Sequence, residues 1–159
     1  MDTTKTEEQF KRVMDECRTL FAKKLHDYGA SWRILRPSSL TDQLFIKAKR
    51  IRSLEITGTS LVGEGIRPEF IALINYGIIG LIQLEKGYVD TVDTKPEEAL
   101  ALYDAHAKEC LELMLRKNHD YNEAWRDMRI SSYTDFILTK IQRIKEIEGL
   151  DGKTLVSEG

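Results

Sequence analysis

The sequence predicts an all-α protein made of tandem duplicated three-helix units, packed as a pseudo-twofold helical bundle, with the second unit lacking its last helix. Three observations lead to this fold class. Apolar residues recur at steps of three and four along most of the 159 residues, which is the period of amphipathic helices. No sustained strand-like alternation of apolar and polar residues appears. A long segment occurs twice, 93 positions apart.

The composition describes a globular protein and excludes several classes. The formal net charge of −2 provides no basic face for nucleic-acid binding. Cys17 and Cys110 hold equivalent apolar positions and are typical of reduced core thiols, so we expect a cytoplasmic protein. The polar first residues are unlike a signal peptide. The apolar run from Phe70 to Ile82 is shorter than the about 20 residues that span a bilayer, so we expect no membrane partner.

The first unit should hold three helices within residues 1–87. The first helix begins near Thr6, where a capping box precedes an apolar stripe of about five turns, and stops at Gly29. A loop over residues 30–38 leads to a second helix capped by Ser39, which ends before a loop at 57–66. The third helix, from Pro68 to about Leu84, is apolar nearly all round and should be central and buried.

Residues 88–95 form a linker to the second unit, residues 96–159, which packs with the first as one domain. Its two helices, one starting at about Pro96 and one from about Tyr133 to Glu148, repeat the first two helices of the chain. No counterpart of the third helix follows, so an apolar face would be left uncovered. We expect either that the chain is shortened or that a homo-oligomer covers this face.

The repeated residues are mostly polar. Between Cys17 and Glu55, seventeen of thirty-nine positions recur 93 residues later without a gap. A repeat kept only for packing would retain its apolar stripe, where Leu, Ile and Met interchange at little cost. The polar repeat therefore predicts a ligand site in each unit.

Four cations recur in each unit, two on the loop and two on the following helix, a pattern suited to multidentate recognition of phosphate or carboxylate. The helix amino terminus adds Ser38 and free N–H groups. The cations are Arg33, Arg36, Lys47 and Arg50, with Arg126, Arg129, Lys140 and Arg143 in the second unit. Asp42 and, in the second unit, His119 and Asp120 complete the charged part of the substrate-binding set. The alternative is that the cations form structural salt bridges with Asp27, Asp42 and Glu55.

Trp32 and Trp125 hold matching loop positions, where an indole either stacks a nucleobase or anchors the loop to the core. Asp27 and Glu55 are the candidate catalytic residues, and with Glu69 they would supply oxygens for Mg²⁺. Asn75 lies within an apolar helix and must find a hydrogen-bond partner, either another helix or a ligand. No Gly-rich phosphate loop, metal-spaced Cys/His cluster or nucleophile elbow is present, which argues against covalent catalysis.

The Lys-x-x-Asp-Tyr-Gly, Trp-Arg, Arg-Pro-Ser-Ser-Leu-Thr-Asp-Gln-Leu and Lys-x-x-Arg-Ile series resembles a bacterial and phage family called the nucleotide modification associated domain family. The residues that carry the resemblance are Lys24, Asp27, Tyr28, Trp32, Arg36, Ser38, Asp42, Lys47 and Arg50. It implies a link to nucleotide metabolism. More distantly, the layout is similar to the MazG-like all-α nucleotide pyrophosphohydrolases. Their hallmark Glu-Glu-x-x-Glu and Glu-x-x-Asp runs are missing here, and Glu69 with Asn75 is the nearest match.

The sequence thus favours a protein that binds a nucleotide or another phosphate-bearing small molecule, with Arg36, Lys47 and Arg50 holding phosphate and Trp32 stacking the base. If the protein is an enzyme, we expect phosphoanhydride hydrolysis or another step in nucleotide modification. The alternative function is a non-catalytic interaction module, in which the repeated charges form a structural network.

Overall fold

The structure is a computed structural model that describes residues 4–58 and 65–156. Five α-helices and two short 3₁₀ helices make up this part of the chain, and no strand occurs in it, so the all-α prediction is confirmed. The elements are α1 (Thr4–Tyr28), η1 (Ser31–Ile34), α2 (Pro37–Thr57), α3 (Arg67–Lys86), α4 (Pro96–Tyr121), η2 (Ala124–Asp127) and α5 (Ile130–Gly149).

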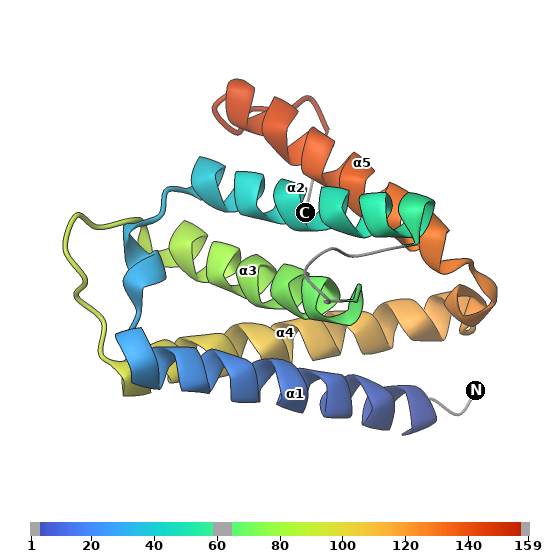
Figure 1. Cartoon of the computed structure of the whole chain (residues 1–159), viewed down its shortest axis with the longest axis horizontal. Helices are drawn as coiled ribbons and strands as arrows, with labels where there is room; N and C mark the ends of the chain where they lie inside the picture. The colour runs from blue at the N-terminus through green and yellow to red at the C-terminus, as the bar shows by residue number, and fades with distance from the viewer. Residues whose placement is uncertain (1–3, 59–64, 157–159) are drawn as a thin grey trace.

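The long helices run side by side (Figure 1). α3 packs against α2 on one side and against α1 and α4 on the other, while α5 packs on the outer side of α2. Each half of the chain has the same element order, namely a long helix, a 3₁₀ turn and a second long helix. α3 is the element that joins the helix pair α1–α4 to the pair α2–α5.

Local sequence signals explain most helix ends. Gly29 has φ +69° and its N–H donates to the Leu25 carbonyl at 2.8 Å, so the predicted stop after Tyr28 is confirmed. α1 begins at Thr4 rather than near Thr6. The predicted cap at Ser39 is wrong, because α2 begins at Pro37, whose fixed φ and missing N–H suit the first helical position.

The remaining expected boundaries hold with small shifts. The predicted loop over 30–38 contains η1, and α5 begins at Ile130, three residues before the expected start. Residues 87–95 are not helical, as expected for the linker. Most of the predicted loop at 57–66 lies outside the described residues.

The main core lies where α1, η1, α3 and the first half of α4 meet. Phe21 stacks on Tyr103 with ring centroids 4.4 Å apart and contacts Trp32 at 6.0 Å. Asn75 Nδ2 donates to the Cys17 carbonyl at 3.1 Å, and its Oδ1 accepts from the Tyr103 hydroxyl at 2.7 Å. The buried amide is therefore satisfied by neighbouring helices, which is the structural alternative for this residue.

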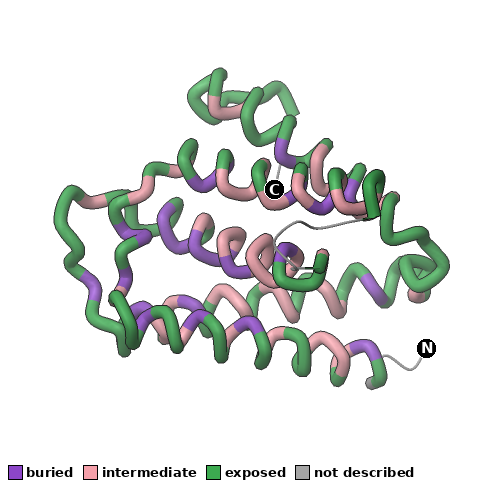
Figure 2. Tube along the Cα trace, viewed as in Figure 1, coloured by how far each residue is buried: buried purple, intermediate pink, exposed green. Residues whose placement is uncertain are grey.

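Burial is uneven between the two halves (Figure 2). α3 buries Ile78, Ile79 and Ile82 but exposes Leu84, so other helices cover only part of its apolar surface. α5 is mostly exposed outside its contact with α2. Within the described residues, no helix is long and apolar enough to cross a membrane.

Candidate functional site

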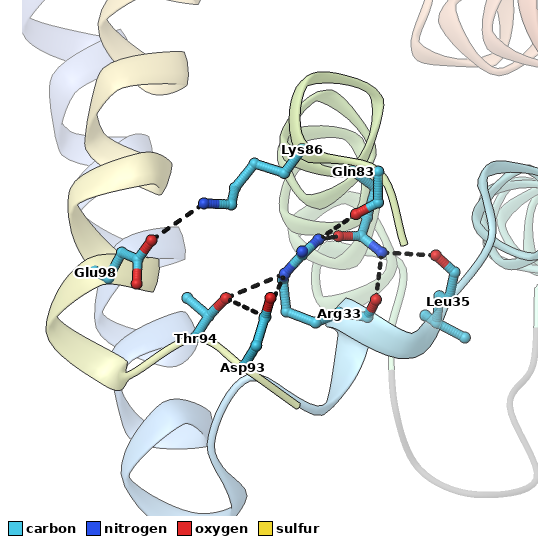
Figure 3. A network of polar contacts seen from close by, with 8 residues as sticks. Arg33, Leu35, Gln83, Lys86, Asp93, Thr94 and Glu98 are labelled. Carbon is cyan, nitrogen blue, oxygen red and sulfur yellow. Dashed lines mark hydrogen bonds and ion pairs between the residues drawn. The ribbon is translucent and has the colours of Figure 1, made fainter. Parts of the chain in front are cut away.

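Arg33 lies at the centre of a buried polar network (Figure 3). Its side chain is 1% exposed. Nε donates to Asp93 at 3.2 Å and to Thr94 at 3.1 Å, and Nη1 donates to Gln83 Oε1 and to the Gly87 carbonyl. Gln83 Nε2 donates in return to the carbonyls of Arg33 and Leu35 at 2.8 and 2.7 Å. This arrangement fastens η1 to the end of α3 and to the α3–α4 connection.

The same network holds an acid in its charged form. The Thr94 hydroxyl and then the Arg33 guanidinium donate to Asp93, and these hydrogen bonds hold the pKa of its carboxyl below the usual range. Arg33 thus bonds to protein groups, but its partners are Asp93, Thr94, Gln83 and Gly87 and not the Asp27, Asp42 or Glu55 of the salt-bridge alternative. Arg36, three residues later, is exposed and lies 4.4 Å from the centroid of the Tyr88 ring.

Lys47 and Arg50 meet a carboxylate of α3. Lys47 Nζ lies 3.6 Å from Glu69 Oε2, and Arg50 Nη1 donates to Glu69 Oε1 at 2.5 Å. The Glu69 side chain is 5% exposed, so this is a nearly buried ion pair. Arg36 immediately precedes α2 and lies eleven residues before Lys47, which places the two about 16 Å apart along the helix axis. The structure therefore does not gather Arg36, Lys47 and Arg50 around one phosphate.

The three predicted metal ligands lie apart. Asp27 is exposed in the last turn of α1, where its Oδ1 is 3.3 Å from His26 Nδ1. That end of α1 adjoins the end of α3, whereas Glu69 begins α3 about 25 Å away along the axis. Glu55 Oε1 is buried and has no hydrogen-bond partner among the described residues. Over the described ranges, no three His, Cys, Asp or Glu side chains gather as a metal site, so the structure does not bring Asp27, Glu55 and Glu69 together.

Trp125 and Arg126 are more exposed than their first-half equivalents, Trp32 and Arg33. Trp125 is 37% exposed, against 8% for Trp32, and its Nε1 donates to Asn118 at 2.6 Å. Arg126 donates to Glu123 at 3.0 Å and to Thr6 at 2.7 Å. Hydrogen bonds from Thr6, then Asn118 and Arg126, hold the pKa of the Glu123 carboxyl below its usual range. The remaining second-half candidates, His119, Asp120, Arg129, Lys140 and Arg143, are exposed, as are Ser38 and Asp42 on α2.

A small cavity lies where α1 ends against η1 and α3. Its volume is about 200 Å³. Lys24, Tyr28 and Trp32 line it, together with Asn75 and Tyr76 from α3. Burial, and next the neighbouring Tyr76, raises the pKa of the Tyr28 hydroxyl, so Tyr28 remains a neutral hydrogen-bond donor at pH 7. The cavity therefore combines aromatic walls, hydroxyl donors and one cation.

The sequence placed Trp32 in the candidate site and offered Asn75 as an alternative ligand contact, but Lys24, Tyr28 and Tyr76 were not among the candidates. Lys24 and Tyr28 recur as Lys117 and Tyr121, and that repetition was the signal that could have placed them there. Tyr76 carries no such signal, because it reaches the cavity only through the packing of α3 against α1.

Comparison with known families adds an independent result. The family model described as Nucleotide modification associated domain 1 matches residues 24–84 and 117–159. The two matched segments begin at Lys24 and Lys117, which are 93 positions apart, the same offset as the sequence repeat. No curated protein and no solved structure matches the chain.

Proposed function

Because the chain belongs to the Nucleotide modification associated domain 1 family, we propose that it binds a nucleotide with the base in the cavity between α1, η1 and α3. One observation carries the proposal. Lys24, Tyr28 and Trp32 recur 93 residues later, belong to the first family-matched segment and line a single cavity.

The chemistry of the cavity suits a nucleobase. Sites for drug-sized ligands occupy about 300–1,000 Å³, so a volume of about 200 Å³ fits a planar ring system rather than a whole nucleotide. Tyr28, Trp32 and Tyr76 supply aromatic surface for the base, and stacking on such rings contributes about 1–3 kcal/mol per base. The Tyr28 and Ser31 hydroxyls would donate to ring nitrogens or carbonyl oxygens.

The sugar and the phosphates would then lie outside the cavity. Lys24 is exposed at the lining of the cavity, on the last turns of α1, and its ammonium would hold the phosphate as a point charge. The proposal stops at binding. Hydrolysis of a phosphoanhydride would also need metal ligands beside the phosphate, and among the described residues the lining of this cavity includes no carboxylate.

Calorimetric titration tests the proposal. Wild-type protein is titrated with nucleoside mono-, di- and triphosphates, with the free bases and with inorganic pyrophosphate. Lys24→Ala should weaken nucleotide binding about tenfold and leave binding of the free base unchanged, because only the phosphate contact is lost. Lys23→Ala is the matched control, since Lys23 is an exposed neighbour on α1 that does not line the cavity.

Two outcomes would refute this assignment. One is that no nucleotide or base binds the wild-type protein at millimolar concentration. The other is that Lys23→Ala and Lys24→Ala reduce affinity equally, which would indicate a general charge effect. A separate feature, the groove between α1 and α4, supports the alternative function of partner docking.

A further inference from the structure

A large apolar groove is lined on one side by α3, from Arg67 to Leu81. The first half of α1, the second half of α4 and η2 form its other walls, and its volume is about 1430 Å³. Its apolar lining includes Phe10, Val13, Met14, Ile74, Met114 and Trp125. Gly77 of α3 also lines it, and a Cβ built at Gly77 would meet nothing within 4 Å. The groove thus has open space beside the α3 backbone at Gly77.

The walls of this groove have counterparts in the first half of the chain. Subtracting 93 from Met114, Trp125 and Met128 gives Phe21, Trp32 and Leu35, which pack in or against the main core. Phe10, on the opposite wall, corresponds in the same way to Tyr103. In the first half, these positions enclose the end of α3.

The exposure of equivalent residues shows what differs between the halves. Trp32 is 8% exposed and Trp125 is 37% exposed. Ile51 on α2 is 0% exposed, and Ile144 on α5 is 40% exposed. α3 packs against α2, and within the described residues no helix packs against α5 in the corresponding way.

We propose that the groove is a docking site for an α-helix of a partner protein, which takes the place beside η2 that α3 takes beside η1. This interaction surface is separate from the nucleotide cavity. The partner helix presents an apolar face to Phe10, Met114 and Trp125, with a small residue where it crosses Gly77. Closely approaching helices of this kind gain packing energy along their whole contact.

The charges that line the groove indicate the charge of the partner helix. Arg12, Arg67, Lys117 and Arg126 line the groove. Arg67 pairs with Glu16 and Arg126 with Glu123, so among the described residues Arg12 and Lys117 are the lining cations without an ion pair. This rim is basic although the chain carries a net charge of −2. In the first half, α3 brings Glu69 to Lys47. The partner helix therefore carries acidic residues that face Arg12 and Lys117.

Charge also argues against a second copy of this chain as the occupant. The exposed apolar residues Phe136 and Ile144 of α5 lie among three cations and three acids, so α5 of another copy would bring no net negative charge to the basic rim. α3 of another copy is held in its own subunit by the Arg33–Gln83 network. The experiment must therefore distinguish a partner helix in the groove from a second copy of the chain that covers it.

The test uses the full chain and a synthetic peptide with the α3 sequence Arg67–Lys86, extended with glutamates at both ends. Trp125 reports binding, because a docked helix removes its ring from water and shifts its emission to shorter wavelength. The expected result is a saturable blue shift at micromolar peptide, weakened by salt. The Trp125→Phe variant should bind the peptide, measured by calorimetry, without that shift.

A matched pair of variants locates the binding surface. Val13 lines the groove and is 37% exposed, whereas Leu20 lies outside it on the same helix and is 38% exposed. Val13→Glu should weaken peptide binding at least tenfold, because it buries an unpaired carboxylate, and Leu20→Glu should leave binding unchanged. Equal affinity of the two variants, or no binding of the peptide to the wild type, would overturn the proposal. So would a wild-type dimer in solution that Val13→Glu converts to a monomer, because a second copy would then cover the groove.

Discussion

Arg33 and Gln83 form two hydrogen bonds in opposite directions: each side chain donates to an acceptor of the other residue. Arg33 Nη1 donates to Gln83 Oε1, while Gln83 Nε2 donates to the Arg33 carbonyl at 2.8 Å. Both residues are 1% exposed. Because Arg33 belongs to η1 and Gln83 to the last turns of α3, this reciprocal pair fixes η1, which forms a wall of the cavity between α1, η1 and α3, to the central helix.

Removing the Gln83 amide should therefore destabilise the fold. We expect Gln83→Leu to lower the free energy of unfolding by about 3 kcal/mol, because it leaves a buried guanidinium and two carbonyls short of partners. Urea denaturation measures the change. Gln142→Leu is the control, since Gln142 is exposed on α5 and donates to Glu146 one turn further along the same helix. A loss below about 1 kcal/mol for Gln83→Leu would contradict the structural role of the network.

The same substitution at equivalent positions should have different effects in the two halves. Ile51→Ala removes a side chain that is 0% exposed, and we expect a loss of about 3–4 kcal/mol. Ile144→Ala removes one that is 40% exposed and should cost below about 1 kcal/mol. Thermal and urea unfolding measure both values. Similar losses at the two positions would mean that Ile144 is buried in solution by an oligomer.

The Arg33 network should also make the free energy of unfolding depend on pH. The pKa of Asp93 is lower in the folded chain than its ordinary value, so its charged form stabilises the fold above the unfolded pKa of about 4. This contribution is lost as the pH falls through the folded pKa. Wild-type stability should therefore decrease more between pH 5 and pH 3 than that of Asp93→Asn. Asp90→Asn, in the same connection and outside the network, should retain the wild-type slope, and equal slopes for wild type and Asp93→Asn would contradict the pairing.

The helices were predictable because each signal is local. Apolar periodicity located α1 to α5, and Gly29 located the end of α1, because one residue's φ determines that turn. The start of α2 was missed because Ser39 and Pro37 are both acceptable start signals, and proline at the first helical position prevailed. Boundaries of this kind depend on competing local preferences.

The site was harder to predict because it depends on distant pairs. Arg33 carries a polar repeat signal typical of a ligand site, yet its partners Gln83, Asp93 and Thr94 lie fifty or more residues away in the sequence. Helical spacing placed Lys47 and Arg50 near each other but did not identify Glu69 as the carboxylate that pairs with both. The uncovered face, in contrast, followed from counting helices, and the structure has an apolar groove beside η2.

A single-tryptophan titration tests nucleotide binding in the cavity most directly. In the Trp125→Phe protein only Trp32 remains, and it lines the cavity between α1, η1 and α3. If the base enters this cavity, nucleotides should quench Trp32 emission in a saturable manner, and Lys24→Ala should shift the midpoint to about tenfold higher concentration. Nucleotide binding by calorimetry with unchanged Trp32 emission would place the ligand elsewhere on the protein and contradict the account.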